Sequence, residues 1–123
     1  MKPGLTGIAR ILAASQNSLN GIRDCWRSES AFRQNSVISS VRVILAFPLA
    51  QTVVDWLILV MPLFLLAIVE LLNSAIENTV DRSGPERHEL SGRAKDMGSA
   101  ATMFCLIMIG TAWLGMVWSR YFA

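Results

Sequence analysis

Charged residues are scarce in this chain of 123 residues: they make up 16% of it, whereas apolar residues make up 53%. Soluble domains typically carry about 25% charged residues, so this balance excludes an ordinary soluble fold. An excess of one charge sign is missing too, because the net charge is +2 and the arginines are scattered. This pattern gives no support for nucleic-acid binding. We interpret residues 1–123 as a single membrane domain.

Cysteine is rare as well. Cys25 lies in a polar amphipathic segment and Cys105 lies inside a long apolar one, so we expect no disulfide framework. The N-terminal apolar stretch around residues 8–14 is short and is interrupted by Arg10, so we expect no cleavable signal peptide. The protein is therefore expected to insert through its own membrane-spanning segments.

Long apolar segments are what the chain does have. Residues 97–118 carry no charge, lie between Asp96 and Arg120, and are long enough to cross a hydrocarbon core of about 30 Å as a helix. Two further apolar segments, 36–50 and 53–69, are separated by Gln51 and Thr52 alone, which predicts a tight hairpin. We expect an all-α integral membrane protein with spanning helices at about 35–50, 53–81 and 96–119.

Residues 5–34 mix apolar, basic and acidic side chains at roughly helical spacing. This pattern predicts an amphipathic helix at the membrane surface. The alternative is a helix that merely packs on the spanning helices. Arg42, the one charge inside the first apolar segment, is expected to reach back to the near surface or to pair with an acidic side chain in the bundle.

Basic residues indicate the orientation. Five lie before the first spanning segment, four lie within 82–95, and none lies in the hairpin. By the positive-inside rule, the N-terminus and the 82–96 connection are cytoplasmic. The four tryptophans lie near the ends of apolar segments, which is typical of interface anchors.

The second apolar helix carries the candidate chemistry. It continues without a helix breaker to Asp81, and helical geometry places Glu70, Asn73, Glu77 and Asp81 on one face. A carboxylate at the bilayer margin costs several kcal/mol unless it is paired, metal-bound or protonated, so Glu70 is a functional candidate. The alternative is a buried structural ion pair.

Two of these carboxylates are expected to do different work. Glu70 and Glu77 lie about 10.5 Å apart along the helix axis, which is too far for both to bind one Mg²⁺ directly. The deeper Glu70 suits accepting a proton from a membrane-borne group, and the shallower Glu77 suits a hydrated cation. The polar connection that follows is rich in groups that bind metals and phosphates, although a solvated linker has the same composition. The chain has neither a P-loop nor a Gly-rich kinase loop, so these residues alone do not establish nucleotide use.

Several motifs together resemble the prokaryotic diacylglycerol kinase family. They are Glu-Ser-Ala-Phe-Arg-Gln at 29–34, Glu-Leu-Leu-Asn-Ser-Ala-Ile-Glu at 70–77, Val-Asp-Arg at 80–82 and His-Glu-Leu-Ser-Gly-Arg-Ala-Lys-Asp-Met-Gly-Ser-Ala at 88–100. The resemblance implies a homotrimer of three-span subunits, each with an N-terminal surface helix, in the bacterial inner membrane. It also implies transfer of the γ-phosphate of Mg-ATP to diacylglycerol, which gives phosphatidate.

The same resemblance implies residue roles. Glu70 is expected to be the general base on the lipid hydroxyl, and Glu29 and Glu77 are expected to hold the Mg²⁺ that bridges the nucleotide phosphates. The residues expected around ATP are Arg10, Glu29, Glu77, Glu86, Arg87, His88, Lys95 and Asp96. Those expected along the lipid path are Arg10, Ser18, Arg23, Trp26, Ala31, Phe32, Arg33, Glu70, Ser99, Trp113 and Trp118. Asn73 and Asp81 are expected to support the site.

Three positions depart from the family pattern. Asn35 stands where a glutamate is expected after Phe-Arg-Gln, Asn17 stands where relatives carry an aromatic residue, and Arg42 is unusual in a first span. Two alternatives to a diacylglycerol kinase stay open. A polyprenol kinase such as undecaprenol kinase would use the same chemistry on another acceptor, and a small oligomeric transporter or membrane anchor would not consume ATP.

Overall fold

The structure, a computed structural model, describes residues 6–82, 84 and 89–123. These residues form four α-helices: α1 (Gly7–Ser28), α2 (Ser30–Leu49), α3 (Val53–Arg82) and α4 (Glu89–Tyr121). No strand occurs within the described ranges. The predicted all-α class is confirmed.

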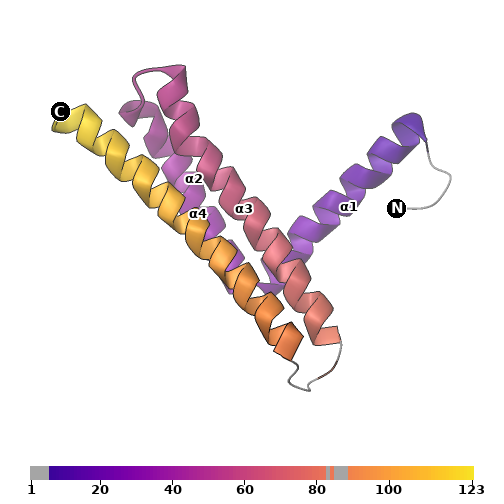
Figure 1. Ribbon diagram of the computed structural model, residues 1–123. Coiled ribbons are helices and arrows are strands. Elements are labelled where there is room, and N and C mark those ends of the chain that lie inside the picture. Colours follow the sequence, from indigo (N-terminus) through magenta and orange to yellow (C-terminus); the bar gives the residue numbers. More distant parts are fainter. Residues whose placement is uncertain (1–5, 83, 85–88) are drawn as a thin grey trace.

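Helices α2, α3 and α4 lie side by side as a bundle, and α1 projects away from it (Figure 1). The most extensive packing is between α3 and α4, α2 packs mainly on α3, and α1 contacts both α2 and α3. α3 is therefore the central element, which every other helix touches.

The end of α1 differs from the prediction of one helix over residues 5–34. The helix stops at Ser28 because Glu29 is extended, with φ −117° and ψ 107°. The Arg33 guanidinium donates hydrogen bonds to the carbonyl oxygens of Trp26 at 2.6 Å and Arg27 at 3.1 Å. These carbonyls belong to the last turn of α1 and lack partners within that helix. Residues 30–34 consequently belong to α2.

The tight hairpin predicted at Gln51 and Thr52 is confirmed, since α2 ends at Leu49 and α3 begins at Val53. The Thr52 hydroxyl oxygen accepts a hydrogen bond from the backbone N–H of Asp55 at 3.1 Å. The Asp55 carboxylate in turn accepts one from the backbone N–H of Gln51 at 3.1 Å. This reciprocal capping fixes the start of α3.

The core lies between α2, α3 and α4. Leu59 and Leu66 of α3 are fully buried, each at most 1% exposed. Trp113 of α4 packs against both parts of the core, and its indole N–H donates a hydrogen bond to the Leu59 carbonyl oxygen at 3.1 Å. Trp113 thus ties α4 to α3.

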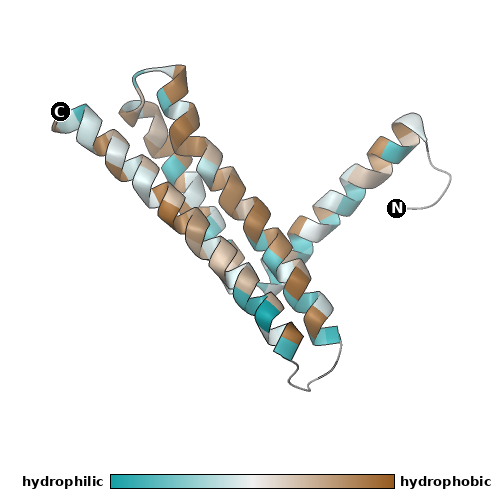
Figure 2. Ribbon diagram, in the orientation of Figure 1, coloured by the Kyte–Doolittle hydropathy of each residue, from teal (hydrophilic) through white to brown (hydrophobic). Residues whose placement is uncertain are grey.

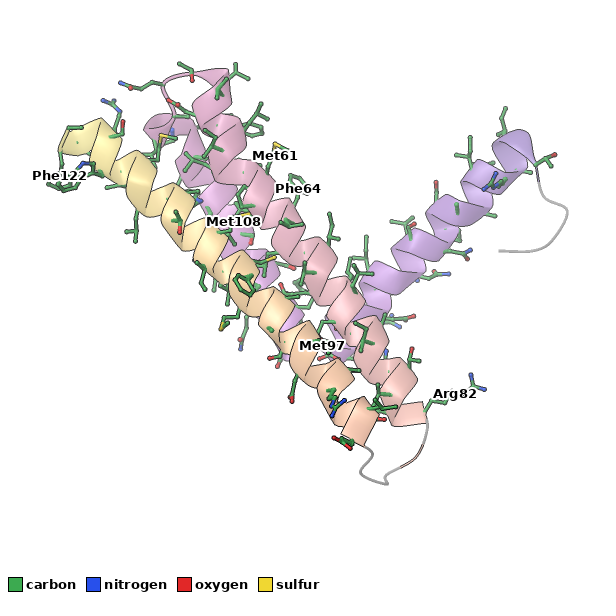
Figure 3. The ribbon with its side chains drawn as sticks, viewed as in Figure 1. Met61, Phe64, Arg82, Met97, Met108 and Phe122 are labelled. Atoms are coloured by element: carbon green, nitrogen blue, oxygen red, sulfur yellow. The ribbon has the colours of Figure 1, made fainter. Side chains whose placement is uncertain are left out.

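The outer surface of the bundle is apolar. Met61 and Phe64 of α3 point outward beside Met108 of α4 (Figure 3), and the two α3 side chains are 62% and 66% exposed. Hydrophobic residues gather along the middle of α3 and α4, and hydrophilic residues gather where α3 ends and α4 begins (Figure 2). Both helices have the length and composition to cross a membrane. An apolar exterior of this kind suits contact with lipid.

Removing the cap of α3 tests this description of the hairpin. Thr52→Ala should lower the free energy of unfolding in detergent by about 1 kcal/mol, because the Asp55 N–H loses its acceptor. Thr111→Ala is the matched control, since the Thr111 hydroxyl donates only to the Ile107 carbonyl of its own helix, at 2.8 Å. That variant should stay within about 0.5 kcal/mol of the wild type. Equal losses in the two variants would contradict the capping role.

Candidate functional site

A cavity of about 170 Å³ opens beside the acidic face of α3. Glu70, Asn73, Ser74 and Glu77 line it from α3, as their helical spacing requires. The opposite walls come from the junction of α1 with α2, from α2 and from α4: Glu29, Ala31, Phe32, Asn35 and Thr102. The cavity therefore gathers side chains from segments far apart in the sequence.

Glu70 is the most deeply placed charged group of the site. Its side chain is 7% exposed, and within the described ranges no other charged residue is buried. The Asn35 side-chain amide donates a hydrogen bond to Oε2 of Glu70 at 3.0 Å. No lysine or arginine of the described residues pairs with this carboxylate, which argues against the alternative of a structural ion pair. A buried carboxylate without a cation is costly and is typical of functional sites.

Glu29 and Glu77 line the same cavity and are both half-buried. Neither forms an ion pair with any residue that the structure describes. Across those residues, no three metal-ligating side chains lie close enough to hold a metal ion by themselves. Two carboxylates do suffice for Mg²⁺ when phosphate oxygens and water complete its coordination. The donor set therefore fits a cation that arrives with a phosphorylated ligand.

Asn73 faces α4 at Gly98, where its side chain lies against the α4 backbone. A Cβ atom added to Gly98 would overlap the side-chain oxygen Oδ1 of Asn73. That oxygen is buried and accepts no hydrogen bond from the described residues. Buried acceptors are usually satisfied, and this one is an exception because it lies against the Gly98 backbone.

A second groove, of about 460 Å³, lies between α1 and α3 and shares Ser74 with the cavity. Ser18 and Cys25 line it from α1. The Cys25 thiol donates to the Ser74 hydroxyl oxygen at 3.5 Å, and burial raises the pKa of this thiol above its ordinary value. α1 thus rests on the same face of α3 that carries Glu70.

Asp81 shares the face of Glu70 in the sequence pattern but does not line the cavity. Its carboxylate instead pairs with the Lys95 ammonium group at 2.7 Å, and both side chains are substantially exposed. This ion pair joins the end of α3 to the beginning of α4. Asp96 lies exposed beside it.

Other predicted residues lie away from the cavity. Arg10, Arg23 and Trp26 are exposed on α1, Arg33 bonds to the end of α1, and Ser99 is exposed on α4. Trp113 and Trp118 lie 11 and 16 residues beyond Thr102, about 17 and 24 Å along the axis of α4. Trp118 stacks on Phe122 with ring centroids 5.5 Å apart. The predictions for Glu86, Arg87 and His88 fall outside the described residues.

Three cavity residues escaped prediction from the sequence. The sequence singled out Asn35 only because it stands where the family pattern has a glutamate, and it did not predict a place for Asn35 in the cavity. Ser74 could have been found, because it follows Glu70 by four residues and shares its helical face. Thr102 lines the cavity because α4 packs on α3, and this tertiary contact cannot be read from the local sequence pattern.

Comparisons with known proteins place the chain among relatives of one family. Residues 16–117 match the family described as prokaryotic diacylglycerol kinase. The chain is 44% identical to the diacylglycerol kinase of Escherichia coli K12, over 98% of this chain and 99% of that protein. It is 46% identical to the diacylglycerol kinase of Pseudomonas aeruginosa, over 89% of each chain. It is 38% identical to that of Haemophilus influenzae, over 91% of this chain and 95% of the other.

The contact of Gly98 with Asn73 can be tested by substitution. Gly98→Ala should lower the free energy of unfolding in detergent by about 1 to 3 kcal/mol, because the new methyl group displaces the Asn73 side chain held between α3 and α4. Combining it with Asn73→Ala should restore most of the loss. Gly110→Ala is the control, since a Cβ there meets nothing within 4 Å. A Gly98→Ala variant as stable as the control would show that the helices do not approach so closely.

Proposed function

This chain belongs to the prokaryotic diacylglycerol kinase family, and we propose that it transfers the γ-phosphate of ATP to diacylglycerol, giving phosphatidate. The observation that carries the proposal is Glu70, which is buried in the cavity without a cationic partner among the described residues. The match over nearly the whole length of known diacylglycerol kinases supports the choice of acceptor.

Phosphoryl transfer asks for alignment, charge neutralisation and a base near the nucleophile. We assign Glu70 as the base that accepts the proton of the lipid hydroxyl. Its Oε2 is engaged by Asn35, and its other oxygen, Oε1, makes no hydrogen bond to the described residues. The hydroxyl of a diacylglycerol lies at the headgroup boundary, where α3 passes from its apolar to its polar part (Figure 2). Glu70 lies on this stretch of α3 and can meet the lipid from within the bilayer.

The cation and the nucleotide are assigned to the polar side of the same cavity. Glu29 and Glu77 are the proposed Mg²⁺ ligands, because both are half-buried carboxylates without a described partner. Bound Mg²⁺ would neutralise the phosphate oxygens of ATP. Further residues proposed to contact ATP are Arg10, Glu86, Arg87, His88, Lys95 and Asp96. Lys95 is proposed to supply positive charge, and its ion pair with Asp81 holds it where α3 ends and α4 begins. Arg10 is proposed to supply positive charge from α1, outside the cavity.

The proposed setting is the bacterial inner membrane. α2 is proposed as a third spanning helix beside α3 and α4, because its 20 residues extend about 30 Å. α1 then lies on the cytoplasmic surface with its exposed apolar residues in the interface. The N-terminus and the connection from α3 to α4 face the cytoplasm by the positive-inside rule. The family resemblance supports a homotrimer.

One assay tests the function directly. Purified protein in mixed micelles receives ATP labelled in its γ-phosphate, Mg²⁺, and either diacylglycerol, undecaprenol or no lipid. We expect labelled phosphatidate from diacylglycerol and much less product from the polyprenol. A marked preference for undecaprenol would overturn the choice of acceptor. An absence of both ATP consumption and labelled lipid would overturn the kinase assignment and favour a transporter or anchor.

The role of Glu70 is tested by an amide of the same shape. Glu70→Gln should lower kcat by at least about 100-fold, because the amide cannot accept the hydroxyl proton. The variant should remain folded, as judged by its unfolding midpoint in detergent. Glu89→Gln is the control, since Glu89 is an exposed carboxylate that pairs with Arg93 at 2.6 Å. Near-normal turnover by Glu70→Gln would refute the base assignment.

Glu77 is tested by a magnesium titration. Glu77→Gln should raise the Mg²⁺ concentration for half-maximal activity roughly tenfold, because one anionic ligand is lost. The Glu89→Gln variant should titrate like the wild type. An unchanged titration curve for Glu77→Gln would exclude Glu77 as a metal ligand.

A further inference from the structure

Asn35 stands out among the cavity residues because it touches the proposed base directly. Its amide nitrogen lies 3.0 Å from Oε2 of Glu70, although the two residues are 35 positions apart on different helices. Asn35 is half-buried in α2 and lines the cavity. This contact is the one hydrogen bond to Glu70 that the described side chains make. Among the described side chains, the Asn35 amide is therefore the polar group that holds this carboxylate in place.

The direction of this hydrogen bond follows from the chemistry of its two groups. An ionised carboxylate has no hydrogen to donate, so the Asn35 amide nitrogen is the donor and Oε2 of Glu70 is the acceptor. Hydrogen bonds to charged acceptors are stronger than those to neutral ones, so this contact holds the carboxylate firmly.

The consequence for Glu70 is geometric. A glutamate side chain has three rotatable torsions, and its terminal torsion is broad, so an untethered carboxylate samples many orientations. Donation to Oε2 leaves Oε1 as the oxygen that can face a substrate. A base must lie within hydrogen-bond reach of the proton that it removes. Fixing Oε1 in one orientation raises the fraction of time that it lies within reach of the lipid hydroxyl.

We propose that Asn35 is the positioning residue of the kinase, holding Oε2 of Glu70 so that Oε1 meets the lipid hydroxyl. This inference rests on the proposed function, in which Glu70 is the base. Asn35 neither contacts the transferred phosphate nor accepts a proton, because its amide does not titrate. Its contribution therefore falls on the rate of the chemical step and not on the binding of diacylglycerol or ATP.

Removal of the donor is the first test. Asn35→Leu keeps a similar volume but has no side-chain N–H, and Asn35→Ala removes the amide altogether. Both should lower kcat roughly ten- to hundredfold, the range that a hydrogen bond to a charged group represents. The KM values for diacylglycerol and ATP should stay within about twofold of the wild type. Two variants of different side-chain size guard against a loss caused by misfolding, which an unfolding curve also reports.

Gln34→Leu is the matched control. Gln34 is the adjacent amide on α2, is exposed and does not line the cavity. Its kcat should equal that of the wild type. A comparable loss in Gln34→Leu, or a rise in KM without a change of kcat in the Asn35 variants, would overturn the positioning role.

A double-mutant cycle separates positioning from a general structural effect. Glu70→Asp withdraws the carboxylate by one methylene, so it no longer meets the Asn35 amide. Adding Asn35→Leu to Glu70→Asp should then lower kcat by less than about twofold, because the tether is already lost. If the two losses instead multiply, Asn35 does not act through Glu70.

The activity of the wild-type protein shows whether the positioning role or the kinase function has failed. If it phosphorylates diacylglycerol and Asn35→Leu does so with unchanged kcat, the inference fails and the proposed function stands. If the wild type does not phosphorylate a lipid, the function fails and the positioning role is refuted with it.

Discussion

The close approach of α4 to α3 at Gly98 determines how the rest of the bundle is arranged. Without a side chain at this position, the backbone of α4 reaches Asn73 of α3, and the helices stay in contact along their length. Trp113 secures the same pair nearer the hairpin by donating to the Leu59 carbonyl. Dispersion and hydrogen bonding have to hold these helices together in lipid, where burial of apolar surface from water contributes little.

This packing also creates the environment of Glu70. α2 and α4 cover the face of α3 on which the carboxylate lies, so little of it is exposed, and no described cation compensates its charge. An arrangement of this kind costs stability and gives none back through an ion pair. Natural proteins keep such groups where function requires them. The cost is limited here because Asn35 donates a hydrogen bond to one carboxylate oxygen.

Sequence patterns were sufficient for features that depend on local spacing. The length of α3, the tight hairpin at Gln51 and Thr52, and the shared face of Glu70 and Glu77 all follow from periodicity and turn length. Sequence patterns did not predict features that depend on a side chain from another helix. α1 ends at Ser28 because Arg33 of the next helix caps it, and the Asp81 carboxylate turns to Lys95 because α4 returns alongside α3. Asn35 meets Glu70 for the same reason, since only the packing of α2 on α3 brings them together.

The junction between α1 and α2 consists of one extended residue, Glu29, and the Arg33 guanidinium spans it by donating to the carbonyl oxygens of Trp26 and Arg27. Glu29 also lines the cavity, so the residue that turns the chain is the one that presents a carboxylate to the site. α1 is therefore joined to the bundle through the same residue whose carboxylate lines the cavity. The orientation of α1 relative to the bundle and the position of the Glu29 carboxylate therefore cannot vary independently of each other.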